Sequence, residues 1–123
     1  MDVRTKRIYE DPAPSDGTRV LVDRLWPRGV SKADAALDDW AREVAPSDDL
    51  RRWFDHDPAK WERFRERYRA ELRDGGARLD DLRALGADGT LTLLYAATNE
   101  EHNNAVALKA ILEADDADDA DGA

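Results

Sequence analysis

Two short polar segments of the sequence carry residue types from which a binding site could be built. One follows an apolar run that ends at Val22, and the other begins at the end of a second apolar run, at Tyr95. Guanidinium groups bind phosphate and carboxylate oxygens through paired hydrogen bonds, and amides and helix N-termini hold further oxygens. The set favours binding of a small anion, such as phosphate, a nucleotide or a phosphorylated metabolite. The predicted ligand-binding residues are Asp23, Arg24, Trp26, Arg28, Tyr95, Thr98, Asn103 and Asn104.

The charged residues of the first segment also have a structural interpretation. Asp23 and Arg24 could form a structural ion pair, and Arg28 could be an exposed turn residue. An arginine that leaves a buried strand needs a partner because desolvating an unpaired guanidinium is costly. Neighbouring strand residues point to opposite faces, so Asp23 alone is a poor partner. The expected partners of Arg24 come from Asp38, Glu43 or the loop 98–104.

The uncharged candidates have structural alternatives too. Asn103 and Asn104 stand near a helix start, where asparagine caps the helix or braces a loop. Trp26 lies in a Pro-Gly loop and could pack within that loop or stack on a flat ligand. Tyr95 could be a core phenol or a site hydroxyl, and the two interpretations stay open.

If the protein is an enzyme, these groups favour hydrolysis or transfer at a phosphate or carbonyl. Asp23 would act as the base, and Arg24 and Arg28 would stabilise the developing charge. The chain has no cysteine, and it contains no G-x-G-x-x-G, P-loop or H-E-x-x-H motif. His56 lies too close to its flanking aspartates to share one ion with them, and His102 is interpreted as a surface residue. We therefore expect neither a metal nor a cofactor.

The elements that must position these groups are three strands and the helices between them. Strands are predicted at 3–9, 19–22 and 90–95, and the second and third are short apolar runs typical of strands buried on both faces. A long helical connection separates these two strands, which predicts that they are adjacent and parallel. The fold class is therefore α/β, a small three-layer domain with a short, mainly parallel sheet flanked by helices. Ligands collect at the carboxyl ends of the strands in such sheets.

Helical periodicity fills the remainder of the chain. Ser47 is the expected cap of a helix that starts at 48, and Asp57 with Pro58 begins the next one. Thr98 and Glu101 have the spacing of a capping box that opens the last helix. A short helix is expected at 79–85. The apolar stripe of the second helix consists of Trp61, Phe64, Tyr68 and Leu72, and the tryptophans at 40, 53 and 61 are expected in the core.

Composition bounds the class of protein. The 123 residues carry a net charge of −9, but six of the 28 acidic residues lie in 113–123. We predict a single domain over 1–112 and a disordered acidic tail over 113–123. The nearly balanced body argues against nonspecific nucleic-acid binding, which needs a basic face. A membrane span needs about 18 apolar residues in a row, and the sequence has no such run and no signal peptide, so the protein is expected to be cytoplasmic.

The assembled motifs resemble one family. RVLVDRLWPRGVSK, WERFRERYRAEL and TLTLLYAATNEEHNNAVALK look like the YeaO-like proteins, a widespread prokaryotic family without an assigned activity. The likeness covers residues 6–112 and implies a compact α/β domain, with no substrate or cofactor. It also implies that longer relatives carry a cysteine where Tyr95 stands and a Cys-His-Arg triplet near Asn103 and Asn104. This chain lacks both, so thiol chemistry does not carry over.

Two classes of function follow. The leading interpretation is a small protein that binds an anion in a crevice between the loops 23–28 and 95–104. The alternative is a noncatalytic protein-interaction module, for example an accessory to a transcription or stress-response protein. No pattern in the residues indicates an oligomeric state.

Overall fold

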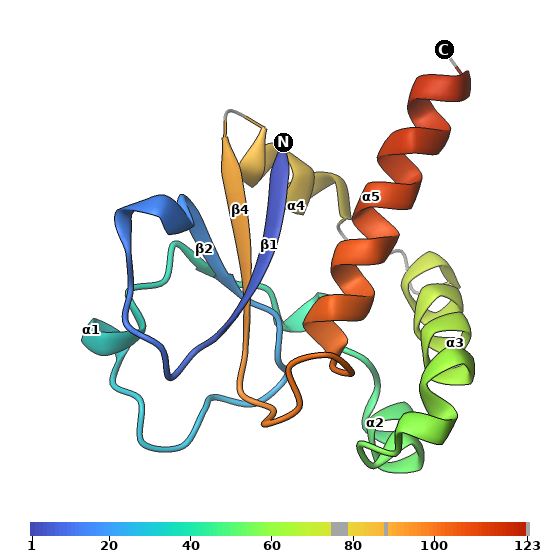
Figure 1. The fold of residues 1–123 in the computed structure, drawn as a ribbon, viewed down its shortest axis with the longest axis horizontal. Coiled ribbons are helices and arrows are strands. Elements are labelled where there is room, and N and C mark those ends of the chain that lie inside the picture. Colours follow the sequence, from blue (N-terminus) through green and yellow to red (C-terminus); the bar gives the residue numbers. More distant parts are fainter. Residues whose placement is uncertain (75–78, 88, 123) are drawn as a thin grey trace.

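Four parallel strands form the centre of the molecule (Figure 1). The structure is a computed structural model that describes residues 1–74, 79–87 and 89–122, with side chains described up to residue 114. The strand order is β1-β4-β2-β3, and every pairing is parallel. The strands are β1 (Asp2–Arg7), β2 (Thr18–Leu21), β3 (Asp39–Trp40) and β4 (Thr90–Tyr95). The helices are α1 (Lys32–Ala35), α2 (Asp48–Phe54), α3 (Trp61–Asp74), α4 (Leu79–Gly86) and α5 (Asn104–Gly122), with short 3-10 turns at Pro14–Asp16, Arg42–Val44 and Pro58–Lys60.

The strand pair that carries the candidate site is formed as predicted. Strand β2 lies beside β4 in parallel, with Val20 opposite Leu93 and Leu21 opposite Leu94. Helices α2, α3 and α4 lie in the long connection between the two strands, which a parallel pair requires. The carboxyl ends of the strands point toward the lower edge of the sheet in Figure 1, where the loops after β2 and β4 meet.

Both faces of the sheet are buried. Val20 and Leu93 face a large apolar core, to which α2, α3, α4 and α5 contribute. Leu21 and Leu94 face the other side and pack against Ala35 and the adjoining loops. This alternation follows from the two-residue period of a strand. The fold is the expected small three-layer α/β domain, with α1 and its loops as the thinner outer layer.

The predicted cap of α2 is confirmed, whereas Asp57 and Pro58 begin a 3-10 turn, Pro58–Lys60, and α3 itself starts at Trp61. Ser47 Oγ accepts a hydrogen bond from Leu50 N at 3.1 Å, and Asp57 Oδ1 accepts one from Ala59 N at 3.0 Å. Helix α3 buries Phe64, Tyr68 and Leu72 of the predicted stripe, and the Tyr68 hydroxyl donates to the Val44 carbonyl. The caps therefore fix where α2 and the turn before α3 begin, and the stripe fixes how α3 packs.

The start of the last helix differs from the prediction. The expected capping box at Thr98 and Glu101 is wrong, because α5 begins at Asn104. Asn99 Oδ1 accepts hydrogen bonds from the backbone N–H groups of Glu101 and His102, both at 2.9 Å, and this local turn competes with a helix. Asn103 Oδ1 then accepts from Val106 N at 2.9 Å and caps α5.

Strand β3 was not predicted. It is a two-residue edge strand, and it places Trp40 beside β2 rather than at a helical position in the core. The Trp40 ring packs edge to face on Trp26 at 5.3 Å, and its Nε1 donates to the Asp23 carbonyl at 2.8 Å. Trp40 therefore supports the loop that follows β2.

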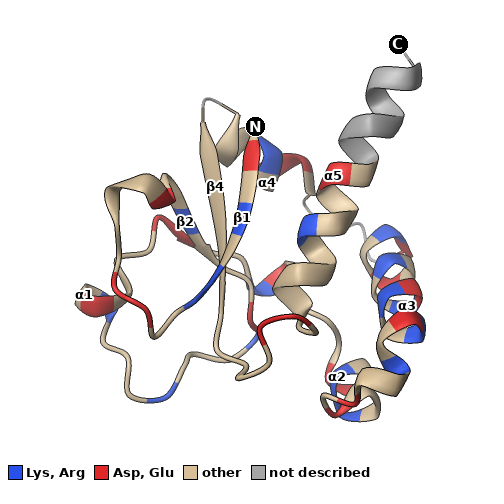
Figure 2. Cartoon of the chain, viewed as in Figure 1, with Lys and Arg blue, Asp and Glu red and all other residues tan. Residues whose placement is uncertain are grey.

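Charged residues of both signs are spread along the chain (Figure 2). Helix α3 shows bands of both signs, as expected for an amphipathic helix whose outer face is in water. The expected disordered tail, 113–123, falls mostly on residues whose side chains lie outside the described part of the chain, and it stays a prediction. Among the described residues, none of the helices combines the length and apolar character that crossing a membrane requires.

One charged cluster is buried instead. Asp16 accepts from Arg19 Nη1 at 2.5 Å and from Lys6 Nζ at 3.1 Å, and Arg19 Nη2 donates to the Ala35 carbonyl at 2.8 Å. Burial alone would raise the pKa of Asp16, but hydrogen bonds from Ala13 N, Lys6 and Arg19 outweigh it and hold the pKa below its ordinary value. The cluster joins the turn before β2 to α1.

Candidate functional site

A cavity of about 390 Å³ opens at the carboxyl edge of the sheet, between the loops after β2 and β4 and helix α2. Its volume lies within the range typical of small-molecule sites. Six of the eight predicted ligand-binding residues line it: Asp23, Arg24, Trp26, Arg28, Asn103 and Asn104. The cavity therefore opens between the two loops from which the candidate residues were taken, and we call it the carboxyl-edge cavity.

Asp23 is the residue that ties the two loops together. Its Oδ2 accepts a hydrogen bond from Ala96 N at 2.9 Å, and its Oδ1 accepts one from Asn104 Nδ2 at 3.0 Å. Burial raises the pKa of the Asp23 carboxyl, while the bonds from Asn104 and Ala96 and the charges of Arg51 and His56 act in the opposite direction. A carboxylate, which accepts but does not donate, thus lies at the meeting point of the loops.

The two asparagines have different tasks. Asn103 is buried and caps α5, and its Nδ2 donates to the Asn99 carbonyl at 2.9 Å. Asn104 Nδ2 donates both to Asp23 and to the Val22 carbonyl, the latter at 2.9 Å. The predicted bracing role is therefore seen for both, and both also line the cavity.

Basic side chains line the exposed part of the cavity. Arg24, Arg28, Arg51 and His56 all line it, and all four residues are exposed. Arg24 Nε lies 3.6 Å from Asp48 Oδ1, and its Nη2 lies 3.5 Å from the Pro46 carbonyl, so Arg24 pairs neither with Asp23 nor with the predicted partners.

The other two guanidinium groups differ in their partners. Arg51 Nη2 lies 3.3 Å from the same Asp48 oxygen. Arg28 forms no ion pair with any residue that the structure describes. Its guanidinium group therefore does not form the ion pair with Asp48 that Arg24 and Arg51 form.

Aromatic rings form the apolar part of the lining. Trp26 is held in place because its Nε1 donates to the Val30 carbonyl at 2.7 Å and its ring packs on Trp40. Phe54 and Phe64 stack with ring centroids 4.2 Å apart. Trp26 therefore packs within its loop, which was one of its two predicted roles, and it also lines the cavity.

Tyr95 and Thr98 are not among the lining residues. Tyr95 is buried in the large core, where burial and the charges of Glu100 and Glu10 raise the pKa of its phenol. Thr98 is exposed on the loop after β4. Their role as ligand-binding residues stays a prediction.

Several lining residues were missed from the sequence. Arg51 and Phe54 lie on α2, His56 lies two residues beyond its end, and Phe64 comes from α3. In the sequence His56 was considered only as a metal ligand, and that role was rejected because Asp55 and Asp57 flank it too closely to share one ion with it. Within the described ranges, no three His, Asp or Glu side chains are grouped as a metal ion would need.

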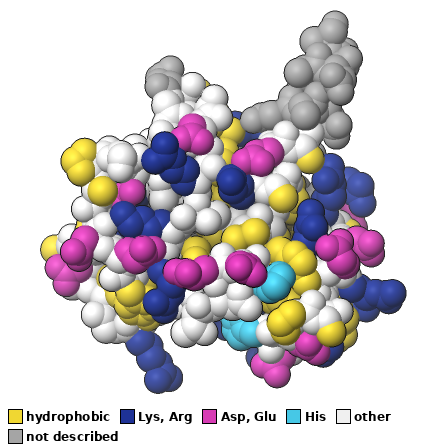
Figure 3. All heavy atoms as spheres, viewed as in Figure 1, with side chains coloured by type: hydrophobic (Ala, Val, Ile, Leu, Met, Phe, Trp, Pro, Cys, Tyr) yellow, Lys and Arg dark blue, Asp and Glu magenta, His cyan; other side chains and the backbone are white. Residues whose placement is uncertain are grey.

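Both histidines lie near apolar side chains in the lower half of the face shown in Figure 3. The His56 ring is 6.1 Å from Phe54, and the His102 ring packs edge to face on Trp61 at 5.1 Å. His56 lines the carboxyl-edge cavity, and His102 does not.

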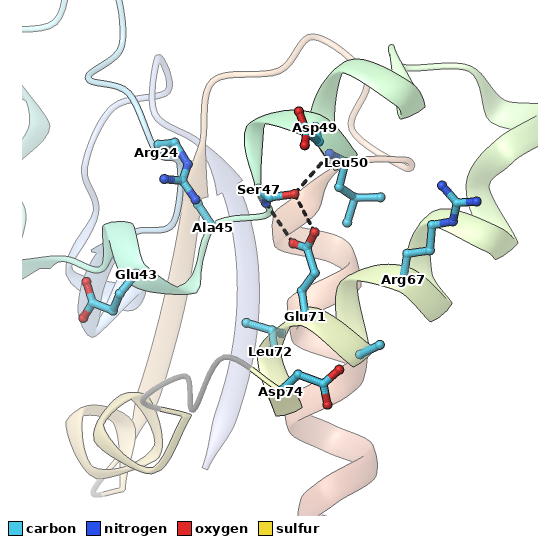
Figure 4. A pocket seen from close by; sticks show the side chains of 11 residues that line it. Arg24, Glu43, Ala45, Ser47, Asp49, Leu50, Arg67, Glu71, Leu72 and Asp74 are labelled. Carbon is cyan, nitrogen blue, oxygen red and sulfur yellow. Dashed lines mark hydrogen bonds between the residues drawn. The ribbon is translucent and has the colours of Figure 1, made fainter.

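A second, more open hollow of about 810 Å³ lies between α2 and α3 (Figure 4). Glu71 points toward Ser47 there and accepts from Ser47 N at 2.9 Å and from Ser47 Oγ at 2.5 Å. Its charged lining is mainly acidic, with Glu43, Asp49, Glu71 and Asp74 against Arg24 and Arg67. Since the Ser47–Glu71 contact joins the start of α2 to α3, we interpret it as a structural brace.

Comparison with known proteins identifies the family. A family described as "Inactive DUF488-N3 subclade" matches residues 2–123. The chain belongs to this subclade. The uncharacterised protein YeaO of Escherichia coli K12 is 45% identical over 111 residues, which cover 88% of this chain and 94% of YeaO. The uncharacterised protein Rv3073c of Mycobacterium tuberculosis is 42% identical over 110 residues, covering 89% and 92%.

These matches confirm that this DUF488-N3 protein resembles the YeaO-like proteins over nearly its whole chain. No solved structure matches the chain at a significant level.

Proposed function

We propose that this chain is a cytoplasmic protein that binds a small anion, such as phosphate, a nucleotide or a phosphorylated metabolite, in the carboxyl-edge cavity. The observation that carries the proposal is the charge of the lining. Three guanidinium groups and one imidazole face a single carboxylate, Asp23, beside aromatic walls. Arginine forks match phosphate and carboxylate oxygens geometrically, and a partly enclosed site strengthens such contacts.

The present partners of these arginines do not compete strongly with a ligand. Arg24 and Arg51 share Asp48, and all three side chains are between 42% and 49% exposed. An exposed ion pair contributes about 0–1 kcal/mol, whereas a hydrogen bond to a charged group in a better enclosed site contributes about 1.5–3 kcal/mol. A phosphate that bridges several guanidinium groups would therefore displace Asp48.

Binding without turnover fits the site better than catalysis. The subclade carries the description "Inactive". Asp23, the predicted base, already accepts hydrogen bonds from Ala96 N and Asn104 Nδ2, which hold it in a fixed position between the loops. We therefore propose a binding role for Asp23.

Isothermal calorimetry with inorganic phosphate, sulfate and adenosine monophosphate tests the proposal. Arg51→Ala removes a lining guanidinium, and Arg52→Ala removes its exposed neighbour on α2, which does not line the cavity. Loss of one charge-assisted contact, about 1.5–3 kcal/mol, should weaken binding about ten- to hundredfold in Arg51→Ala.

Arg52→Ala should bind as the wild type does, because Arg52 does not line the cavity. Thermal melts of both variants establish that each is folded. The proposal fails if the wild type binds none of the three anions, or if the two variants weaken binding equally, since equal loss would reflect the general surface charge.

A further inference from the structure

The carboxyl-edge cavity has two chemically different ends. Asp23 is only partly exposed, and burial raises its pKa, whereas Arg24, Arg28 and Arg51 are exposed at the mouth. The carboxylate therefore forms an inner end that accepts hydrogen bonds, and the arginines form an outer end that attracts anions. A ligand that fills both ends must itself be asymmetric.

The side chains at the inner end can accept further hydrogen bonds, but their N–H donors are already used. Asn104 Nδ2 has two hydrogens, and they are directed to Val22 O and Asp23 Oδ1. Asn103 Nδ2 donates to Asn99 O. Each Asp23 oxygen accepts one described bond, and a carboxylate oxygen has room for a second. A group placed against Asp23 must therefore donate, and a second anion there would be repelled.

Apolar side chains form much of the rest of the lining. Trp26, Pro27, Pro46, Phe54 and Phe64 all contribute to the lining. Phe54 and Phe64 are buried and stack on each other, whereas Trp26 is partly exposed and the hydrogen bond from its Nε1 to Val30 O keeps that ring in place. Planar rings gain both area burial and stacking against such surfaces. A planar group that carries N–H donors thus suits the space next to Asp23.

From this arrangement we infer that the ligand is a nucleoside monophosphate, with the amino or imino groups of the base bound by Asp23 and the phosphate bound by the arginines. The inference rests on the proposed function, because it places the anion where that function does. It makes Asp23 the residue that determines specificity. Carboxylates accept from exocyclic amino groups of bases in the same way in nucleic-acid recognition.

The test compares ligands that share a phosphate and differ in the base. Calorimetry on the wild type uses adenosine monophosphate, guanosine monophosphate and ribose 5-phosphate at one ionic strength. At least one nucleotide should bind about tenfold or more tightly than ribose 5-phosphate, which corresponds to one hydrogen bond to a charged acceptor. The same series is run on Asp23→Asn and on Asp49→Asn, a matched change at an exposed residue outside this cavity.

Asp23→Asn should lose the preference for the nucleotide and keep its affinity for ribose 5-phosphate, while Asp49→Asn should behave as the wild type does. Equal binding of nucleotides and ribose 5-phosphate by the wild type would overturn the inference and leave the proposed anion site standing. Absence of binding by every phosphate compound would overturn both. If Asp23→Asn does not fold, the wild-type series alone decides.

Discussion

Asn104→Ala tests the junction that holds the two loops of the cavity together. The substitution removes the hydrogen bonds from Asn104 Nδ2 to Val22 O and to Asp23 Oδ1. Val22 is fully buried, so its carbonyl loses a partner that water cannot easily replace, which costs about 1–3 kcal/mol. The lost bond to the partly exposed Asp23 adds a smaller cost. Alanine is the better helix former by up to about 0.7 kcal/mol, which offsets part of the loss.

The net expectation is a decrease in the free energy of unfolding of about 2–3 kcal/mol. An unfolding entropy of about 2.1 cal/mol/K per residue gives about 0.26 kcal/mol/K for a chain of this length, so Tm should fall by about 8–12 °C. Calorimetric melts of the wild type and the variant measure this directly. Asn104→Asp should be worse than Asn104→Ala at neutral pH, because it directs a second carboxylate at Asp23 and at the Val22 carbonyl.

Thr98→Ala is the matched control, since Thr98 lies on the same loop and is exposed. It should change the free energy of unfolding by less than about 0.5 kcal/mol. The reasoning is refuted if Asn104→Ala melts within about 2 °C of the wild type, which is less than about 0.5 kcal/mol at this chain length. That result would mean that the Asp23–Asn104 junction does not hold the loops.

Three further predictions concern charge and backbone. Because the folded-state pKa of Asp23 is raised, the wild type should gain stability relative to Asp23→Asn as pH falls from 7 toward the ordinary aspartate value of about 3.9; denaturant melts that show no such trend would contradict this. Asp16→Ala leaves Arg19 buried without its carboxylate partner and should lower the free energy of unfolding by about 3–5 kcal/mol above pH 4. Because the pKa of Asp16 is lowered in the folded state, this difference between wild type and variant should shrink as pH falls below about 3.9. A difference that does not change with pH would contradict the prediction. Gly17→Ala should cost about 1–3 kcal/mol, because φ is 62° and the added Cβ would lie 2.4 Å from Thr90 O; an unchanged Tm would show that the turn relaxes.

The strand pair and the position of the cavity could be predicted because they depend on short-range patterns. Strands β2 and β4 contain short runs of buried apolar residues, at 20–21 and 93–95, and a parallel pair follows from the length of the connection between them. The polar residues that follow such strands then lie at one edge of the sheet. Asp23 and Asn104 were found in this way without any knowledge of the tertiary contacts.

The remaining features depend on packing between distant segments. Strand β3 has only two residues, and its place comes from pairing with β2 and from the contact of Trp40 with Trp26. Arg51 and His56 reach the cavity because α2 packs beside the loops, and no local pattern encodes that orientation. The start of α5 was misplaced because the side chain of Asn99 forms a turn that a spacing rule does not include.

The most direct measurement of the central claim is a two-dimensional NMR titration of the ¹⁵N-labelled protein with inorganic phosphate and adenosine monophosphate. Binding in the carboxyl-edge cavity should shift the Ala96 amide and the Trp26 indole N–H, which lie at its wall, and leave the indole signals of Trp53 and Trp61 in place. Saturable shifts confined to Ala96, Trp26 and their neighbours would support the account. Shifts centred on another surface, or none at millimolar ligand, would contradict it.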